Sequence, residues 1–357
     1  MSKPTVSVIV DTYNHQSFIE NAIESVLDQD FPSNELEIVV VDDGSTDQTA
    51  ALLHKFEPRI RIIRKLNGGQ ASAFNAGIAA TQGEIVAFLD GDDWWANHKL
   101  SSVVTAFREN PNVAAVGHGY YEVPDGEPPS AMVVATETCY IDLSSVENAR
   151  IASLGRTLLG TSRLSVRRRV LDRIGRIPEA LVFCADAPIL TLSLAFSGAI
   201  ILNQTLCYYR LHSGSLFTHS SPDSAKSLRK AEMLSLTVEY LRPRLKELGL
   251  SQAVAAITLE AYQVEVDRLR LQFGGQGRWR SAALELRDFR ASYRNASIKY
   301  TLFKTAVAAL AGILPPERFY AVREWYGRRN LQRFRDKLAS ADSDATLAPF
   351  RRCSIQR

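Results

Sequence analysis

The first 93 residues alternate between short apolar runs and segments whose apolar residues recur at helical spacing. Apolar runs at 6–10, 36–41, 60–64 and 85–89 predict strands. The spacing predicts helices over 18–27 and 71–81, and Ser45 with Gln48 forms a possible capping box for a helix after the second strand. Repeated strand–helix units predict a parallel, twisted sheet that binds ligands at the carboxyl ends of its strands.

Polar side chains follow each of the four predicted strands. They lie at 11–14, 42–43, 67–70 and 90–93. Any one of these groups is also common as a turn or a helix cap. Because the carboxyl ends of parallel strands share one rim of the sheet, all four groups are expected to converge, and this convergence favours a binding site.

Carboxylates on such a rim would repel a phosphate unless a divalent cation lay between them. Mg²⁺ or Mn²⁺ is commonly held by one or two carboxylates together with substrate phosphates. Asp90 and Asp92 are therefore the expected metal ligands, and the metal would bind a diphosphate. Asp43, further along the rim, is expected to accept hydrogen bonds from a base or a ribose.

Four stretches, VSVIVDTYN, VVVDDGSTD, NGGQASAFNAG and VAFLDGDDWW, resemble in order and spacing the signatures of the family 2 glycosyltransferases. The resemblance covers roughly the first 100 residues. It implies an α/β GT-A (nucleotide-diphospho-sugar transferase) fold, a mostly parallel Rossmann-like sheet flanked by helices. It also implies a nucleotide-sugar donor, an Asp-x-Asp metal site and transfer with inversion.

The resemblance implies roles for individual residues on the donor side. Asp11, Thr12 and Tyr13 would lie beside the base, Asp43 would bond the uracil ring, and Asn75 would belong to the donor site. Many relatives have proline at the position of Asp11, so UDP is the expected nucleotide while another is left open.

The metal roles follow from the same resemblance. Asp90 would lie near the ribose and the metal, Asp92 would be the direct ligand, and His212 would complete the metal or diphosphate site. The role of Asp93 is the least defined of the three carboxylates. Trp94 and Trp95 are expected to divide between a sugar-stacking position and the core.

An inverting transfer also needs a base for the acceptor hydroxyl. Asp186 stands where the family has the aspartate of a Glu-Asp pair, and Ala185 replaces the glutamate. Asp186 is therefore the expected general base, and a helix N-cap is a compatible alternative. The run Arg167, Arg168 and Arg169 is interpreted as a solvated helix face rather than a phosphate contact.

The C-terminal part of the chain is basic and helical. Residues 224–357 contain 25 Lys and Arg against 13 Asp and Glu, which predicts contact with something anionic. We expect a GT-A domain at 1–220 (nucleotide-binding half 1–100, acceptor half 101–220), a helical region at 224–338 and a flexible tail at 339–357. The apolar stretch 301–314 is too short to span a membrane, and the aromatic and arginine residues after it fit either a membrane interface or packing on the catalytic domain. No nucleic-acid-binding motif is present, so no nucleic acid partner is expected.

The four cysteines form no CxxC pair, so neither a zinc site nor a disulfide framework is expected. The start of the chain lacks a signal-peptide pattern. A cytoplasmic location, or a peripheral one at the inner face of the membrane, fits both observations.

The predicted activity is metal-dependent, inverting transfer of a sugar from a nucleotide-diphosphate sugar. Its acceptor would be a hydroxyl of a saccharide or a lipid-linked saccharide, in cell-surface polysaccharide or glycolipid synthesis. Two alternatives remain at this point: a nucleotidyltransferase and a non-catalytic sugar-nucleotide-binding protein.

Overall fold

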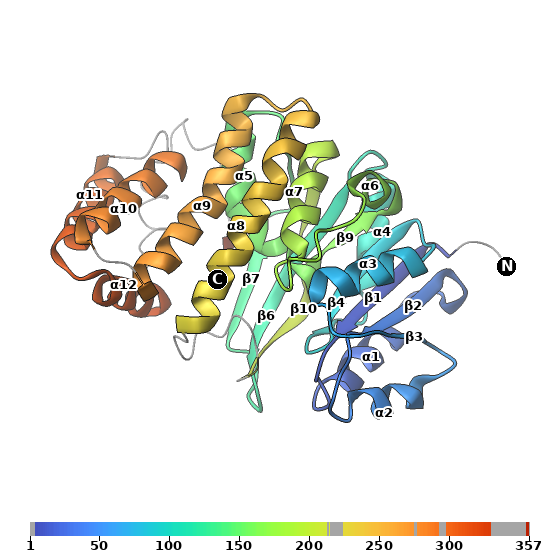
Figure 1. The fold of residues 1–357 in the computed structure, drawn as a ribbon. Coiled ribbons are helices and arrows are strands. Elements are labelled where there is room, and N and C mark those ends of the chain that lie inside the picture. The colour runs from blue at the N-terminus through green and yellow to red at the C-terminus, as the bar shows by residue number, and fades with distance from the viewer. Residues whose placement is uncertain are drawn as a thin grey trace.

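The computed structural model describes residues 4–212, 214, 224–274, 277–292, 298–329 and 355–356. A large curled sheet of mixed parallel and antiparallel strands lies at its centre, flanked by helices, and the last helices gather at one side (Figure 1). The strand order is β11-β7-β6-β9-β4-β1-β2-β3, and β10 pairs with β5, β6 and β8 outside this path.

The N-terminal part of the sheet is parallel, as the strand–helix alternation predicts. β1 pairs with both β2 and β4, and β3 extends the sheet beyond β2. The strands are β1 (Val6–Thr12), β2 (Leu36–Asp42), β3 (Arg61–Arg64) and β4 (Ile85–Asp90); the helices are α1 (Ile19–Leu27), α2 (Thr49–Leu53) and α3 (Gln70–Ala80). The predicted strands and helices are confirmed, with ends that differ by one or two residues.

The start of α2 differs from the expectation of a capping box. The N-cap residue is Gln48, and its side chain makes no capping hydrogen bond. The hydroxyl of Ser45 instead accepts from the backbone of Asn14, and Asp47 accepts from the N–H of Thr49. A nearer acceptor thus satisfies the exposed donor of the first helical turn.

Continuous apolar strands are buried on both faces, as expected for a covered parallel sheet. Val8, Ile9 and Val10 of β1 have no exposed surface. On one face Phe74 of α3 contacts Phe88 of β4, with ring centroids 4.9 Å apart. This packing fixes α3 on the sheet and the polar turn before α3 at the strand ends.

The second half of the sheet adds antiparallel pairs. β9 lies between β4 and β6 and is antiparallel to both, whereas β10 runs parallel to β6. The strands are β5 (Trp94–Trp95), β6 (Ala115–Pro124), β7 (Ala131–Ala135), β8 (Cys139–Ile141), β9 (Ser165–Arg167) and β10 (Ala199–Leu211); the helices are α4 (Lys99–Glu109), α5 (Val146–Gly155), α6 (Arg168–Ile174) and α7 (Asp186–Ser197).

The arginines at 167–169 do not form a solvated face. Arg167 donates to the carbonyls of Phe107 and Val113, at and beyond the end of α4. Arg168 donates to the carbonyl of Ile78 in the last turn of α3. Helix C-termini attract cations because their last carbonyls lack intrahelical partners, so the interpretation as a solvated face is wrong for these two side chains.

The described residues between 224 and 329 are mainly helical. Side chains of α8 and α9 join the core of the sheet domain, whereas α10, α11 and α12 form a smaller core against α9. The helices are α8 (Ser224–Glu247), α9 (Gln252–Gly274), α10 (Arg278–Ser292), α11 (Ile298–Ile313) and α12 (Pro316–Arg329). None of the helices in the described ranges is both long and apolar enough to cross a membrane.

The structure adds two findings that the sequence did not predict, one in the C-terminal tail and one among the cysteines. Most of the proposed tail at 339–357 lies outside the described residues, but β11 (Ile355–Gln356) pairs antiparallel with β7. Cys139 is disulfide-bonded, whereas Cys184 and Cys207 are free. The sequence offers no reason to expect this disulfide, because pairing partners distant in sequence leave no spacing signal.

Candidate active site

The strand register brings the predicted polar groups to one rim. Asp11 on β1 pairs in register with Asp90 on β4, and Thr12 pairs with Asp42 on β2. The backbone N–H of Gly91 donates to the carbonyl of Asp11 over 2.9 Å. The convergence predicted from the strand–helix pattern is therefore confirmed.

Asp43 lies in a cradle of donors after β2. Its carboxylate accepts from Lys65 Nζ at 2.5 Å, from Gly68 N at 3.1 Å and from Gly69 N at 2.7 Å. Gly69 has φ 82°, and a Cβ atom there would lie 2.5 Å from Val182 Cα, so only glycine fits this turn. The cradle fixes the turn before α3 to the end of β2.

Asp11 and Asp90 are crowded carboxyl groups. Burial, followed by the charge of Asp92, raises the pKa of Asp11 well above its ordinary value, and Oδ1 of Asp11 is buried without a hydrogen-bond partner. Burial and then the charges of Asp11, Asp92, Asp93 and Asp186 raise the pKa of Asp90 in the same way. The carboxylates of the rim therefore oppose one another's ionisation.

Two histidines lie beside Asp92. His212 Nε2 is hydrogen-bonded to Asp92 Oδ2 at 3.0 Å, and His15 Nε2 lies 3.9 Å from the same oxygen. Burial raises the pKa of Asp92, but the bond from His212 and the nearby His15 bring it below its ordinary value. The ring of Phe18 contacts His212 with centroids 4.4 Å apart, which holds the imidazole in place.

Asp93 points away from this group. Only 1% of Asp93 is exposed, and its carboxylate accepts from the backbone N–H of Arg210 at 2.9 Å and from Ser162 Oγ at 2.6 Å. Burial, followed by the charge of Asp92, raises its pKa to about 7. Asp93 therefore ties the acidic loop to β10 and to the segment before β9.

Asp186 lies at the first position of α7. Its Oδ2 accepts from the N–H of Thr161 at 3.2 Å, and burial raises its pKa. The N-cap of α7 is Ala185, without a side-chain capping bond, so Asp186 does not cap the helix. Cys184, two residues before Asp186, has φ 60°, an uncommon conformation for a residue other than glycine.

Gln70 connects the two halves of the site. Its Nε2 donates to Asp90 Oδ1 at 3.1 Å, and its Oε1 accepts from the N–H of Ala185 at 3.0 Å. A single side chain at the start of α3 thereby joins the acidic rim on the donor side to the start of α7. Its polar atoms fix the position of Asp90 relative to Asp186.

Three further predicted donor residues have distinct environments. Thr12 is buried, and its hydroxyl is hydrogen-bonded to His15 Nδ1 at 3.2 Å. Tyr13 is 44% exposed, so its ring is open to a ligand. Asn75 instead lies buried, and its amide both donates to and accepts from the backbone of Ile177. These bonds hold the chain before α7. They also occupy both polar atoms of the Asn75 amide.

One of the two tryptophans lies in the core, and the other is partly exposed. Trp95 is 3% exposed, and its Nε1 donates to the carbonyl of Ser162 at 2.7 Å. Trp94 is half-buried and stacks on Tyr208 with centroids 5.0 Å apart, and the guanidinium of Arg210 lies 4.4 Å from its ring. The ring of Trp94 is thus engaged by protein neighbours, which makes a sugar-stacking role less suited to it.

Some residues of the site were not singled out from the sequence. Gln70 lies within the motif NGGQASAFNAG, and His15 directly follows VSVIVDTYN. Both residues could therefore have been predicted from these motifs. The long-range contacts of Lys65, Ser162 and Arg163 have no local signal. The guanidinium of Arg163 is buried over the ring of Tyr120, 4.3 Å from its centroid, and it lowers the pKa of Asp93 and Asp186 against the effect of burial.

The acidic rim fits a cation without forming a complete coordination shell. In the described ranges, no group of three or more His, Cys, Asp and Glu side chains stands ready to hold a metal ion. The unpartnered oxygen of Asp11 and the mutual repulsion of Asp11, Asp90 and Asp92 nevertheless suit a divalent cation that binds together with substrate phosphates.

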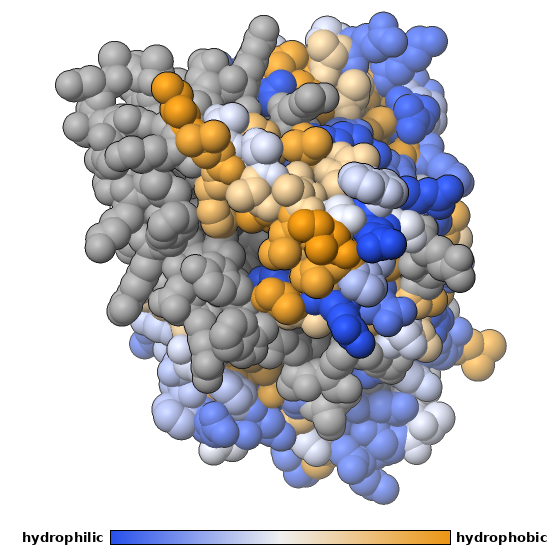
Figure 2. All heavy atoms as spheres, turned by 90° about the vertical axis from the view of Figure 1, so that its left-hand side faces the viewer, coloured by the Kyte–Doolittle hydropathy of each residue, from blue (hydrophilic) through white to orange (hydrophobic). Residues whose placement is uncertain are grey.

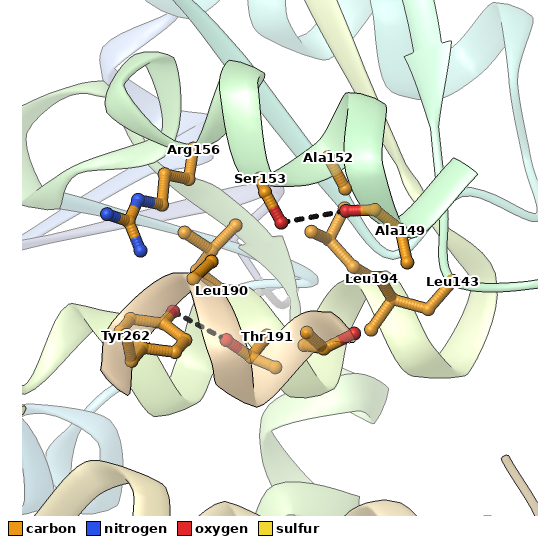
Figure 3. Close-up of a pocket in the computed structure, with 11 residues that line it drawn as sticks. Leu143, Ala149, Ala152, Ser153, Arg156, Leu190, Thr191, Leu194 and Tyr262 are labelled. Carbon is orange, nitrogen blue, oxygen red and sulfur yellow. Dashed lines mark hydrogen bonds between the residues drawn. The ribbon is translucent and has the colours of Figure 1, made fainter. Parts of the chain in front are cut away.

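A separate small cavity lies away from the rim, between α5, α7 and α9 (Figure 3). Its volume is about 20 Å³, enough for about one water molecule. Tyr262 and Thr191 line it and share a hydrogen bond of 2.8 Å. Its size excludes a sugar nucleotide, so it is not the donor site.

Comparison with known proteins identifies relatives by sequence. Residues 7–151 match the family model described as Glycosyl transferase family 2. An uncharacterized glycosyltransferase of Nostoc sp. (strain PCC 7120) is 35% identical over 262 residues, which cover 70% of this chain and 78% of the relative. The putative teichuronic acid biosynthesis glycosyltransferase TuaG of Bacillus subtilis is 30% identical over 245 residues, which cover 67% of this chain and 90% of TuaG.

Solved structures share the fold. The mannosyltransferase PcManGT of Pyrobaculum calidifontis, in complex with GDP-Man and Mn²⁺, has a TM-score of 0.54 at 21% identity over 91% of this chain and 85% of its own. Residues 1–349 of S. aureus TarS, in complex with UDP-GlcNAc, give 0.51 at 22% identity over 81% and 89%. At these identities the likeness bears on the fold, and the expected GT-A class is confirmed.

Proposed function

Because the chain belongs to glycosyl transferase family 2 and is a glycosyltransferase, we propose that it transfers a sugar, with inversion, from a nucleotide-diphosphate sugar to a hydroxyl of a saccharide or lipid-linked saccharide. UDP is the proposed nucleotide and Mg²⁺ or Mn²⁺ the proposed cofactor. The observation that carries the proposal is the crowded rim of Asp11, Asp90 and Asp92 beside Asp186. A nucleotidyltransferase or a binding protein without activity is disfavoured by the family.

The donor nucleotide is assigned to the ends of β1 and β2. Asp43 is held by Lys65 and the turn before α3, and Tyr13 is open to a ligand at the neighbouring strand end. Asp11 and Thr12 lie in register between Asp90 and Asp42. This arrangement supports a base and ribose held along the rim, with the diphosphate directed to Asp90 and Asp92.

Asp92, Asp90 and His212 would hold the divalent cation. The cation would stabilise the charge that grows on the leaving diphosphate. Asp92 has an environment that keeps it ionised, and its hydrogen bond with His212 already brings two of the three groups together at 3.0 Å. The structural neighbours were solved in complex with UDP-GlcNAc in one case and with GDP-Man and Mn²⁺ in the other, and these ligands are consistent with the proposal.

Asp186 is the proposed general base. Burial raises the pKa of Asp186 above its ordinary value, and a carboxylate with a higher pKa is a better proton acceptor. The N–H of Thr161 bonds to one carboxylate oxygen, and Gln70 holds the preceding residue. These contacts would orient Asp186 toward a hydroxyl that attacks the anomeric carbon on the side opposite the diphosphate.

The acceptor class is proposed from the names of two relatives. TuaG is named for teichuronic acid biosynthesis, and TarS of Staphylococcus aureus, 39% identical over 108 residues, is a poly(ribitol-phosphate) β-N-acetylglucosaminyltransferase. One name thus refers to teichuronic acid biosynthesis and the other to sugar transfer onto poly(ribitol-phosphate). A polysaccharide or glycolipid of the cell envelope is therefore the proposed acceptor class.

The test is metal-dependent binding and hydrolysis of a panel of nucleotide sugars. UDP with Mn²⁺ should raise the melting temperature of the protein more than either alone, and Asp92→Asn should abolish the added shift. Asp186→Asn should keep the shift and lose transfer by at least about 10³-fold. Absence of any metal-dependent stabilisation by UDP or another nucleotide would overturn the proposal.

A further inference from the structure

The outer face of α11 has no charged side chain among its described residues. Ile298, Leu302 and Ile313 are 81%, 65% and 66% exposed, and they lie on one side of the helix with small residues between them. The exposed set, called the α11 face below, is Ile298, Thr301, Leu302, Thr305, Ala306, Ala309, Leu310 and Ile313. These residues recur at helical spacing over the whole length of α11.

The opposite side of α11 is already covered. Ala311 is fully buried and packs with Phe319 of α12 and Leu284 of α10 in the smaller core. Lys304, which is 5% exposed, also lies on this inner side. A helix that is apolar all round normally has both sides covered, whereas the described residues cover only one side of α11.

Aromatic and basic side chains border the α11 face. Trp279 at the start of α10 is 78% exposed, and a Cβ atom at Gly312 would lie 3.5 Å from its ring, which places the ring beside the end of α11. Arg278 and Arg280 next to it are exposed, as is Arg318 of α12. Figure 2 shows orange and pale orange spheres gathered across the middle of this side of the molecule, with blue spheres beside them.

The exposed charged side chains around the α11 face are mostly basic. Among the side chains described between 277 and 323, the single exposed acidic residue is Glu317. The acidic residues of α10 turn inward instead: Glu285 pairs with Arg323 at 3.3 Å, and Asp288 pairs with Arg268 at 3.1 Å. An apolar centre with a basic border therefore suits an anionic partner that also has an apolar interior.

We propose that the α11 face and Trp279 dock on an anionic membrane surface, with α11 lying in the plane of the interface. Apolar side chains would enter the acyl boundary, Trp279 would lie at the level of the headgroups, and Arg278 and Arg280 would contact anionic lipid. This proposal rests on the proposed function, because docking on a membrane would bring the enzyme to a lipid-linked acceptor. Binding itself does not require activity.

A second copy of the chain fits the face less well. In a twofold pair, the same surface would meet itself. The arginines that border one face would then approach those of the other, with Glu317 as the sole exposed acid of the described border to compensate them. Like charges brought together in this way oppose association, whereas anionic headgroups would offset them.

Vesicle co-sedimentation of the full chain tests the apolar contact. Wild type is expected to bind phosphatidylcholine vesicles that contain about 30 mol% phosphatidylglycerol. Leu302→Glu with Ile313→Glu should lower the partition coefficient by at least about tenfold. The control Leu66→Glu changes a leucine that is 90% exposed on the sheet domain and should bind as wild type does. Unchanged binding of the double variant would overturn the proposal.

A second pair of variants tests the charge contact. Arg278→Gln with Arg280→Gln should lower binding to the anionic vesicles by about tenfold and should have little effect on phosphatidylcholine alone. Arg59→Gln with Arg108→Gln removes two exposed arginines of the sheet domain and should leave binding unchanged. If both pairs of variants lost vesicle binding equally, binding would depend only on the net charge of the protein. That result would contradict a defined docking face.

Two further measurements separate the remaining outcomes. If the glutamate variants fail to fold by circular dichroism, Trp279→Ala should still lower the partition coefficient by about threefold or more. Light scattering that shows a dimer in wild type, converted to a monomer by Leu302→Glu, with no vesicle binding, would assign the face to self-association and overturn the proposal. Donor hydrolysis without vesicles tests the proposed function separately, because it does not involve this face.

Discussion

Asp92 and Asp93 are adjacent in the chain and have opposite environments. Asp92 faces the two histidines, whereas Asp93 is buried against Arg210 and Ser162. Both residues lie in the turn between β4 and β5, and their carboxylates have different neighbours, so one is available to a ligand and the other to the core. The resemblance favours Asp92 over Asp93 as a ligand, but spacing alone gives no reason for the difference, because the contacts that separate the two residues depend on β10, more than 100 residues away.

Substitution of Asp93 is predicted to affect stability first. Asp93→Ala should lower the free energy of unfolding by about 2 kcal/mol, because it leaves the N–H of Arg210 and the hydroxyl of Ser162 without their acceptor. Urea denaturation of Asp93→Ala and Asp92→Ala would measure the difference. Asp92→Ala should retain most of the stability and lose metal-dependent nucleotide binding. Equal loss of stability in the two variants would contradict this division.

Gln70 is predicted to act as a positioning residue. Gln70→Ala removes the link between Asp90 and Ala185 while the carboxylates remain, so kcat should fall by about tenfold with a smaller change in nucleotide affinity. Gln70→Glu places a further negative charge beside Asp90. This variant should instead weaken nucleotide binding when the affinity is measured in the absence of metal. Steady-state kinetics with calorimetric UDP titration would separate the two effects, and a purely structural role would lower the melting temperature in both variants alike.

At the scale of elements, the parallel half of the sheet was predictable and the antiparallel half was not. The apolar runs that became β1, β2, β3 and β4 are local signals with polar groups directly after them. The insertion of β9 between β4 and β6 depends on pairing partners far apart in the chain. Within the site, Asp90, Asp92 and Asp186 were proposed from motifs. Lys65 and Arg163 were not, because their contacts join residues whose spacing in the sequence gives no signal.

Arg168 offers a test at this scale, since it joins α6 to the end of α3. Its guanidinium donates to the carbonyl of Ile78 at 2.9 Å and to the hydroxyl of Thr81. Arg168→Ala should cost about 1–2 kcal/mol of unfolding free energy, because helix C-terminal carbonyls lose a charged donor. The neighbouring Arg169, with one exposed bond to Pro111, is the matched control and should cost less than about 0.5 kcal/mol.

At the scale of the whole molecule, partly buried ion pairs connect the helices of the C-terminal region. Glu265 of α9 pairs with Lys230 of α8 at 3.2 Å and with Arg268 at 3.0 Å. Burial raises the pKa of Glu265, but the nearby Lys230 and Arg268 dominate and bring it to about 2. Its carboxylate is thus better stabilised in the folded chain than in the unfolded one.

The pH dependence of stability follows from this shift. A folded pKa below the unfolded value means that the contribution of Glu265 is complete above the ordinary pKa and is lost as the pH falls from about 4.5 through about 2. The contribution should be about 3 kcal/mol at neutral pH. Denaturation of wild type and Glu265→Gln at pH 7 and pH 3 should show a difference that narrows at the lower pH. A difference independent of pH would contradict the assignment.

β10 has a consequence for the construction of chimeric enzymes. Its first residues pair with β6 and β8 in the acceptor half, and Arg210 near its end bonds to Asp92 and Asp93 in the donor half. A recombinant that joined residues 1–100 of this chain to the second half of a relative would replace the strand that holds its acidic loop. Exchange of acceptor halves should therefore preserve donor binding only where the incoming strand retains an arginine and a histidine at the positions of Arg210 and His212.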